Sequence, residues 1–387
     1  MCRVAYLDNN ATTPMHEKVL LKMLPFLKDS YGNPSALYDL GKQANLAIQA
    51  ARKEVASLIN SKDNKIIFTS GGSEANSTII MGYCLRKAPK AGHIITTSIE
   101  HPAILKACEF LEKEHDYSIT YLPINSDGII ELNQLENEIR NNTVMISIMM
   151  INNELGTIQP IRSVGEISKR NGIHFHCDAV QAVGKVGIDV EELKIDSLSL
   201  SAHKFGGPKG IGALYLFNKS DIMPLIHGGG QEEGLRSGTE NVAGIVGLGE
   251  AAKLAKERYE FLKEHFVQLR KLFLSKLEEQ LDGWELNVGG EFVYPSTLNI
   301  AFDDIRAEAL ATMLNFYNVS ISIGSACSSS SPKQSHVLTA LGLSNEKIRS
   351  SVRISFGYQT EESEVLYAAE TLIHTVMQLR QLSIQKV

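Results

Sequence analysis

Short apolar runs alternate with helical stretches along the first two hundred residues of the chain. The run at 143–151 is apolar along its length, which is typical of a strand buried on both faces. A helix is expected at 73–85, and further strands are expected at 65–69, 93–97, 173–177, 197–200 and 211–217. Strands that alternate with helices predict an α/β domain built on a mostly parallel sheet.

The pattern changes from about Ala251. A stripe of apolar residues then recurs at helical spacing inside a charged segment, at Leu262, Phe266, Leu269, Phe273 and Leu277. A coiled-coil arm for a partner is one interpretation, but the stripe covers few heptads and favours a long helix that joins two domains. Strands at 296–302 and 351–356, followed by an amphipathic helix at 361–379, predict a small α+β domain after it.

The composition of the 387-residue chain excludes several classes of protein. Hydrophobic residues make up 43% and charged residues 21%, which is close to the average of globular proteins and unlike disordered or fibrous chains. The charges are well mixed and sum to −6, so we expect no direct binding of nucleic acid. No apolar run is long enough to cross a bilayer, and the first residues lack a signal peptide's apolar stretch. We therefore expect no membrane association and a cytoplasmic location.

Five cysteines are scattered along the chain, at positions 2, 84, 108, 177 and 327. An odd set without a CxxC pair argues against a disulfide framework and a zinc site, so any cysteine that matters should act singly, as a thiol. Cys84, Cys108 and Cys177 lie in helical or buried-strand segments and are expected to be buried and inert. Cys327 lies among small residues in 322–332 with no apolar pattern to bury it, so we expect it to be exposed and mobile.

The polar residues after the strand at 65–69 suggest a phosphate-binding turn. Gly71 and Gly72 allow a tight turn, and the N–H groups at the start of the next helix can hold a phosphate together with the Ser73 hydroxyl. The same residues also fit an ordinary turn in which Ser73 is the helix N-cap.

Two further polar groups follow predicted strands. Asp178 ends a buried strand, where a carboxylate needs a positive partner, although it would serve equally as a helix cap. Lys204 stands beside His203 and ahead of a glycine-rich turn, which suits an amine nucleophile in a desolvated cleft as well as a solvated surface lysine. A phosphate cradle, a carboxylate for a pyridinium nitrogen and a Schiff-base lysine are together the parts that pyridoxal phosphate requires.

The cradle, Asp178 and Lys204 belong to a longer series of motifs, at 6–14, 31–35, 71–76, 100–101, 152–156, 178–181, 201–204, 236–241, 324–327 and 352–355. In this series the chain resembles the NifS/IscS-type cysteine desulfurases, within the class V aminotransferase group of fold type I pyridoxal-phosphate enzymes. The resemblance runs nearly end to end and implies a large cofactor-binding α/β domain at 15–255, with helices flanking the sheet. Residues 1–14 and 256–387 would then form a smaller α+β domain that carries the catalytic cysteine loop.

The resemblance assigns most of the matched residues to the cofactor. Lys204 would hold pyridoxal phosphate as a Schiff base, and Asp178 would pair with the pyridinium nitrogen of its ring. His101 would stack on the ring and serve as an acid/base group, while Asn153 and Gln181 would lie near the ring hydroxyl. The phosphate contacts would come from Gly72, Ser73, Ser201 and His203.

Three further residues define the implied reaction. Arg353, with Asn153 nearby, would bind the α-carboxylate of the substrate. Thr239 would reach the phosphate bound by the other subunit, which implies a homodimer. Cys327 would take the sulfur of L-cysteine as a persulfide and leave L-alanine. No resident metal is implied, although Cys327 would be able to act as a transient iron–sulfur ligand.

The acceptor of that sulfur stays open at this point. An iron–sulfur scaffold protein, a tRNA-thiolating enzyme or a nitrogenase assembly protein would each suit the chemistry. The chain stops at Val387, soon after the predicted final helix, so we expect it to lack the C-terminal tail with which IscS-type members dock their scaffold.

Two other functions compete with this interpretation. A related pyridoxal-phosphate enzyme, such as a serine or alanine aminotransferase or a selenocysteine lyase, would find Cys327 dispensable or would prefer selenocysteine. A catalytically silent homologue that works as a binding scaffold should have lost a cofactor residue. The residues that would report such a loss are all present: Lys204, Asp178, His101 and Cys327.

Overall fold

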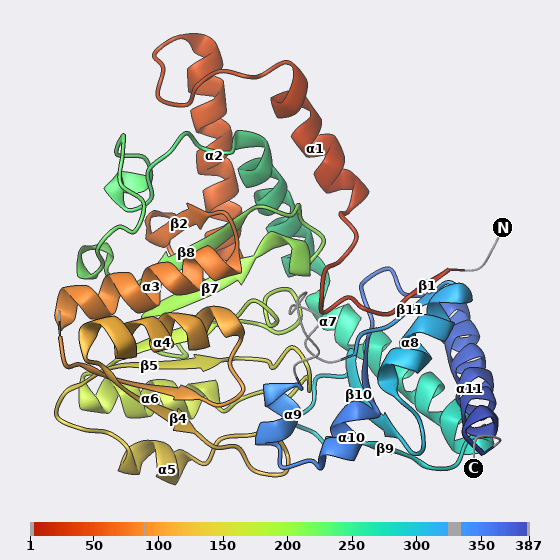
Figure 1. Cartoon of the computed structure of the whole chain (residues 1–387). Coiled ribbons are helices and arrows are strands. Elements are labelled where there is room, and N and C mark those ends of the chain that lie inside the picture. The colour runs from red at the N-terminus through yellow and green to blue at the C-terminus, as the bar shows by residue number, and fades with distance from the viewer. Residues whose placement is uncertain (1–3, 89, 324–333, 385–387) are drawn as a thin grey trace.

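A seven-stranded sheet forms the centre of the larger part of the molecule, and two smaller sheets lie beside it (Figure 1). The structure is a computed structural model that describes residues 4–88, 90–323 and 334–384. Along the large sheet the strands follow the order β2 (Ile66–Thr69), β8 (Gly212–Leu216), β7 (Ser197–Ser201), β6 (His174–Asp178), β5 (Thr143–Met149), β3 (His93–Thr97) and β4 (Ser118–Leu122). Among these strands β8 alone runs opposite to the other six, so the predicted, mostly parallel α/β sheet is confirmed.

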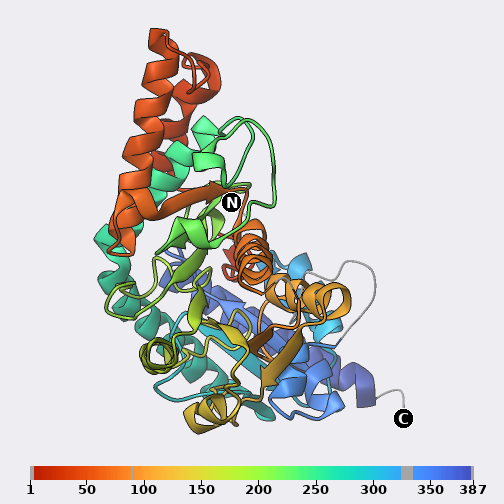
Figure 2. The same ribbon diagram turned by 90° about the vertical axis from the view of Figure 1, so that its left-hand side faces the viewer.

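Helices cover both faces of this sheet, and apolar residues of the strands pack against them on either side. Figure 2 shows these helices from the side. The covering helices are α2 (Asp39–Leu58), α3 (Gly72–Lys87), α4 (Pro102–His115), α6 (Ile161–Asn171) and α7 (Val242–Gln280). On β5, Met145 belongs to the apolar cluster that contains α3 and α4, whereas Ile146 and Ile148 belong to the cluster that contains the other three helices. Two-sided burial explains why this strand is apolar along its length.

The sequence pattern does not predict β4, the strand at one edge of the sheet. Along β4 only Leu122 is buried, and the other residues are partly or fully exposed. An edge strand with one solvated side leaves neither a continuous apolar run nor a clear alternation. Three other strands are too short to leave a pattern: β1 (Ala5–Tyr6), β9 (Trp284–Leu286) and β11 (Val319–Ser320).

The long helix α7 runs from a position beside α2 to the smaller part of the molecule (Figure 1). Its apolar stripe is buried in the core at Phe266, Leu269, Phe273 and Leu277, and Leu262 packs against the same core. The prediction of a long helix that connects the two parts of the molecule is therefore confirmed, and the interpretation as a coiled-coil arm for a partner is wrong. No helix in the described ranges is both long enough and apolar enough to span a bilayer.

The smaller part contains a three-stranded antiparallel sheet in which β10 (Thr297–Phe302) lies between β9 and β12 (Ser351–Ser355). The helices α8 (Ala307–Phe316) and α11 (Glu362–Ile384) pack beside it. Strand β1 pairs in parallel with β11, which joins the N-terminal segment to the C-terminal half of the chain. The strands predicted at 296–302 and 351–356 and the final helix are thus confirmed. The residue boundaries of the two domains stay a prediction.

Helices α2 and α7 approach each other closely at Gly249, because a Cβ there would lie 2.6 Å from the Cα of Ala51. Helix propensity favours alanine over glycine by about 1 kcal/mol. We nevertheless expect Gly249→Ala to lower the free energy of unfolding, by about 1–3 kcal/mol, because the backbone of Ala51 cannot move aside as a flexible side chain would. Urea denaturation checks this, with the exposed Lys253→Ala of the same helix as the control. A Gly249→Ala protein as stable as the wild type would contradict the close crossing.

Candidate active site

Polar residues gather at one edge of the large sheet. Strands β2, β3, β5, β6 and β7 run in the same direction, so their carboxyl ends meet there. Asp178 is the last residue of β6, and just past the ends of β2, β3, β5 and β7 lie, respectively, the predicted cradle, His101, Asn153 and Lys204. Ligands of open α/β sheets bind at this edge, and the fold therefore brings together residues that are far apart in the sequence.

Lys204 lies in the short helical turn η2 (Ala202–Lys204), directly after β7. Its Nζ donates hydrogen bonds to the carbonyl oxygens of Asn10, at 2.7 Å, and Ala11, at 2.9 Å. Both acceptors belong to the N-terminal segment that passes between the two parts of the molecule (Figure 1). Because this lysine is bound internally, the alternative of a solvated surface lysine does not fit.

Asn10 is the residue around which this segment is organised, and it is only 2% exposed. Its carbonyl oxygen also accepts a hydrogen bond from Gln181 Nε2, at 2.8 Å. Its side-chain Nδ2 donates to the carbonyl oxygen of Asn153 and to Thr297 Oγ1, at 3.1 and 2.9 Å. The N-terminal segment is therefore tied to the large sheet and to the smaller part at once, although the sequence offered no role for Asn10.

Asp178 is 4% exposed, and both of its carboxylate oxygens accept hydrogen bonds. Val180 N donates to Oδ1 at 2.9 Å, and Asn76 Nδ2 donates to Oδ2 at 2.7 Å. Asn76 Oδ1 lies 3.2 Å from His176 Nε2, and burial lowers the pKa of His176 to about 3. A turn rather than a helix follows Asp178, so the helix-cap alternative is wrong. Neutral His176 and Asn76 hold the carboxylate in a fixed orientation.

His101 is the N-cap of α4, where its Nδ1 accepts a hydrogen bond from Ala103 N at 3.1 Å. The proton of the neutral ring therefore sits on Nε2. Burial lowers the pKa of His101; the negative charge of Asp178 opposes this, and the positive charges of Lys204 and His336 add to it. His101 is thus a neutral imidazole at pH 7, electrostatically coupled to Asp178 and Lys204.

Glu100, the residue before His101, is completely buried. Its Oε1 accepts hydrogen bonds from Thr97 Oγ1 at 2.8 Å and Met149 N at 2.9 Å, while Oε2 has no partner among the described residues. Burial raises the pKa of Glu100 to about 8; the two hydrogen bonds oppose this shift, and Asp178 adds to it. A neutral carboxylic acid beside His101 therefore predominates at neutral pH.

The predicted phosphate cradle lies at the start of α3. Gly71 is the N-cap of this helix and no side chain caps it, whereas Ser73 is an exposed residue of the first turn. The alternative in which Ser73 is the N-cap is therefore wrong. A Cβ on Gly72 would lie 2.7 Å from Val180 Cγ2, so Val180 would have to shift to admit any other residue, whereas the 3.6 Å to Ser201 Cβ is an ordinary contact. An uncapped helix start beside the Ser201 side chain suits an anion such as a phosphate.

His203 lies beside Lys204 in η2 and faces the N-terminal segment. Its Nδ1 is 3.1 Å from Thr12 Oγ1, and its carbonyl oxygen accepts a hydrogen bond from Thr13 Oγ1 at 2.9 Å. Burial, and to a smaller extent the charges of Lys204 and Lys209, together lower the pKa of His203 to about 4. His203 is therefore a neutral hydrogen-bonding group at pH 7.

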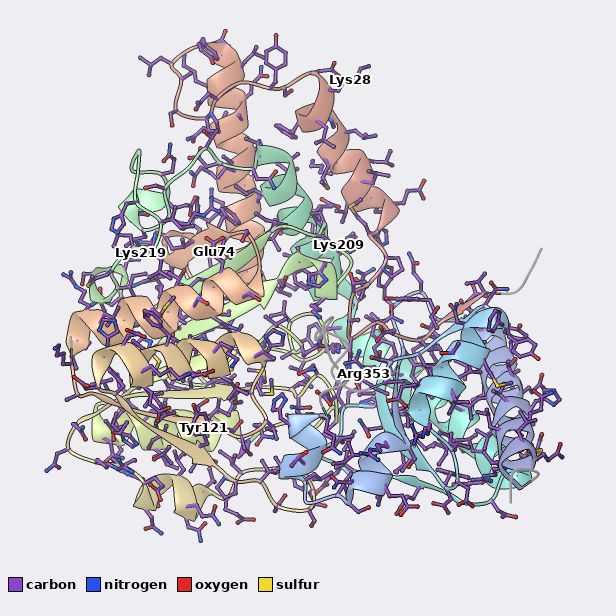
Figure 3. The ribbon with its side chains drawn as sticks, viewed as in Figure 1. Lys28, Glu74, Tyr121, Lys209, Lys219 and Arg353 are labelled. Carbon is purple, nitrogen blue, oxygen red and sulfur yellow. The ribbon has the colours of Figure 1, made fainter. Side chains whose placement is uncertain are left out.

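Arg353 on β12 lies where the smaller part meets the large sheet (Figure 3). It is 3% exposed; its NH1 donates to the carbonyl oxygen of Asn153 at 3.0 Å, and its NH2 to Asp8 Oδ1 at 2.6 Å. Its Nε is buried without a partner among the described residues. An unpaired donor on a buried guanidinium is what a carboxylate ligand would satisfy. The sequence did not point to Asp8, although it lies inside the motif at 6–14.

Thr239 lies in an exposed loop before α7, next to a cavity of about 260 Å³ that Ser70 and Gly210 also line. Arg236 holds this loop to the first turn of α3, because its Nε lies 2.8 Å from Glu74 Oε1. Figure 3 shows Glu74 on that helix. The contact implied for Thr239 is with another subunit, so its role stays a prediction.

Cys327 lies outside the described residues. The described residues before and after Cys327 contact residues of the site. Before it, Ser322 and Arg353 exchange backbone hydrogen bonds of 3.0 and 2.7 Å. After it, His336 Nε2 lies 2.9 Å from the carbonyl oxygen of Glu100. The other predictions for cysteines are confirmed where the chain is described. Cys84, Cys108 and Cys177 are free and buried, and burial raises the pKa of each.

The chain is similar to known proteins over almost its whole length. A family model described as aminotransferase class-V matches residues 5–367. A cysteine desulfurase IscS of Dictyoglomus turgidum is 43% identical over 383 residues, which make up 99% of this chain and 97% of that protein. A solved structure described as a NifS-like protein is 37% identical with a TM-score of 0.91, covering 97% of this chain and 100% of its own. A second, described as SspA in complex with cysteine, is 41% identical with a TM-score of 0.81, covering 91% and 98%.

The neutral Glu100 predicts a dependence of stability on pH. The pKa is raised from 4.5 to about 8, so the folded protein holds this proton more tightly than the unfolded chain does. Its contribution to stability is therefore fully present below about pH 4.5 and is lost as the pH rises through about 8. We expect the free energy of unfolding of the wild type, relative to Glu100→Gln, to fall by up to about 1.4 kcal/mol per pH unit in this window.

Urea denaturation of both proteins at a series of pH values measures this difference. Glutamine keeps an oxygen for the Thr97 and Met149 hydrogen bonds and carries no charge at any pH. Glu114→Gln, an exposed position on α4, is the control. A wild-type-minus-variant difference that does not change with pH would show that burial does not keep Glu100 protonated.

Proposed function

The chain belongs to the class V aminotransferase family and to its cysteine desulfurase group, and on that premise we propose that it converts L-cysteine to L-alanine and transfers the sulfur to Cys327. Members of this family use pyridoxal phosphate. The observation that carries the proposal is the constellation at the sheet edge, where the charges of Asp178 and Lys204 both act on His101 and an uncapped helix start adjoins Ser201. The complex of a similar protein with cysteine supports cysteine as the substrate.

The residues present fit pyridoxal phosphate. Lys204 would hold the cofactor covalently, Asp178 would face its ring nitrogen, and Gln181 and Asn153 would lie near its ring hydroxyl. The start of α3, with Gly72, Ser73, Ser201 and His203, would hold its phosphate. When bound, this cofactor supplies an electron sink that accepts the electron pair of the substrate's Cα–H bond.

Side chains of the protein would transfer the protons and bind the substrate. The Lys204 amine would take the proton from the substrate's Cα and return it later in the cycle. His101 Nε2, which carries the proton of the neutral ring, would exchange a proton with the substrate's thiol. The guanidinium of Arg353, whose Nε is unpaired among the described groups, would bind the substrate's α-carboxylate and hold the molecule in place.

Cys327 would receive the sulfur. The Cβ–S bond of the substrate breaks and an S–S bond to Cys327 forms, so that the cysteine residue becomes a persulfide while the substrate leaves as alanine. The anchoring of the chain on both sides of Cys327 supports this role, because Ser322 pairs with Arg353 and His336 bonds to Glu100, the neighbour of His101. The persulfide sulfur would then pass to an iron–sulfur scaffold protein or to a tRNA-thiolating enzyme in the cytoplasm.

A homodimer is part of the proposal. Large apolar side chains are exposed along α1 (Glu17–Lys28), the segment that follows it and the start of α2: Leu20, Leu21, Leu24, Leu27, Tyr31, Leu37, Tyr38 and Leu46. Figures 1 and 2 show these two helices extending away from the sheet. So many exposed large apolar side chains in one part of the chain are typical of an interface. A second copy would cover it and would bring the exposed Thr239 of each chain toward the other's phosphate.

Replacing the proposed sulfur acceptor tests the reaction. We expect Cys327→Ser to lose both sulfide and alanine production from L-cysteine, because serine cannot form a persulfide, while the yellow cofactor absorbance stays at the wild-type level. The measurement is the yield of both products with a reductant present, at equal cofactor occupancy. Cys108→Ser, which removes a buried thiol, is the control and should keep the activity.

The outcome separates this function from its rivals. A Cys327→Ser protein with full activity would make Cys327 dispensable and favour an aminotransferase or a lyase. A wild-type protein that binds no pyridoxal phosphate would favour a silent scaffold.

Charged substitutions on the exposed apolar face of α1 test whether this face forms the dimer interface. Leu24 and Leu27 lie on one face of α1 and are 46% and 63% exposed. We expect Leu24→Glu/Leu27→Glu to be monomeric, because like charges would face each other across the interface, and to bind the cofactor more weakly. Light scattering after size-exclusion chromatography measures the mass. Lys22→Glu on the same helix is the control, and a double variant with the mass of a dimer would place the interface elsewhere.

A further inference from the structure

Lys185, in the turn that follows β6, is a second lysine close to Lys204, and the reaction described above gives it no role. Its Nζ donates hydrogen bonds to Asn10 Oδ1 at 2.9 Å and to Gln181 Oε1 at 3.1 Å. The backbone of the same residue is held as well, because its carbonyl oxygen accepts a hydrogen bond from Tyr294 at 2.8 Å. Lys185 thus contacts Asn10, whose carbonyl oxygen accepts from Lys204, and Gln181, which donates to that same carbonyl oxygen.

The first consequence of these contacts concerns orientation. An ammonium group can only donate hydrogen bonds, so the side-chain amides of Asn10 and Gln181 must each turn an oxygen toward Lys185. Their nitrogens then point the other way, and Gln181 Nε2 donates to the Asn10 carbonyl oxygen that also accepts from Lys204. A neutral, apolar side chain at position 185 would remove the donor that faces both amide oxygens. The orientation of Asn10 would then rest on its contacts with Asn153 and Thr297, and that of Gln181 on the Asn10 carbonyl oxygen.

The second consequence concerns charge. Lys185 and Lys204 line the same cavity of about 30 Å³, and the charged residues among those that line it are these two lysines and Arg258. The titratable Tyr358 lines it too, and the nearby Arg353 carries a further positive charge that its partner Asp8 offsets. Burial, and to a smaller extent the charges of Lys204 and Arg353, together lower the pKa of Lys185 to about 7. Such coupling is reciprocal, so a charged Lys185 disfavours charge at Lys204.

We propose that Lys185 is a positioning residue of the reaction, which orients the amides of Asn10 and Gln181 and, as a neighbouring cation, favours the unprotonated form of the Lys204 nitrogen. The proposal rests on the proposed function. An amine nucleophile beside a second cation is a known way of making a lysine reactive at neutral pH. The alternative is a purely structural lysine whose hydrogen bonds only stabilise the fold.

The experiment titrates the absorbance of the linkage between Lys204 and pyridoxal phosphate in the intact holoenzyme. With Lys185→Met we expect the protonation midpoint of this linkage to rise by about one pH unit, a roughly tenfold shift, because the repelling charge is gone. Lys185→Arg keeps a donor-only cation and should keep a midpoint close to that of the wild type. Lys276→Met, on the distant end of α7, is the matched control and should leave the midpoint unchanged.

Each outcome decides for or against the proposal. A Lys185→Met midpoint equal to the wild type's would overturn it, even if the variant is less stable, because a structural role changes stability and not this titration. Lys185→Gln is the second neutral variant, and loss of the fold in both neutral variants would also assign Lys185 a structural role. The proposed function fails separately, if the wild type forms no such linkage or makes no alanine from cysteine.

Discussion

The carbonyl oxygen of Asn10 accepts hydrogen bonds from both Lys204 and Gln181, and the rest of the candidate site depends on this shared acceptor. It holds the lysine amine at the end of β7 and gives the glutamine amide its orientation. The same residue donates from its backbone N–H to Ser355 Oγ at 2.9 Å and from its side chain to the carbonyl oxygen of Asn153. A buried segment must pair its polar groups, so the N-terminal chain is held between the large sheet and the smaller part, where Lys204 needs it.

Around this acceptor, burial separates neutral groups from ionised ones. His101, His176 and Glu100 are buried where charge is disfavoured, and the resulting pKa shifts keep all three neutral near pH 7. Charge is retained where a partner compensates it, as in the ion pair of Arg353 with Asp8. A site of this kind offers a cofactor a few fixed charges and a set of neutral hydrogen-bonding groups. Because most of these groups stay in one protonation state, few of them can exchange protons during a reaction.

Much of the fold could be predicted from the sequence, because its strands are buried on both faces and its final helices are amphipathic. Strand β4 could not, since an exposed edge leaves no pattern, and Ser73 suited an N-cap equally well until the structure placed Gly71 there. Asp178 and Lys204 were found because each follows a strand. Asn10, Asp8 and Lys185 were not assigned a role, because nothing in the local sequence distinguishes a polar residue that is paired inside the fold from one in solvent.

The sequence by itself determined the family, the order of the buried strands along the chain and the residue types that the chemistry needs, because motifs and periodicity are local properties. Only the tertiary structure decided which of these residues meet. It brought Asp8 to Arg353 across 345 positions of sequence and Asn10 to Lys204 across 194. It also decided which titratable groups are neutral, since a pKa depends on burial and on neighbouring charges that only the folded chain assembles.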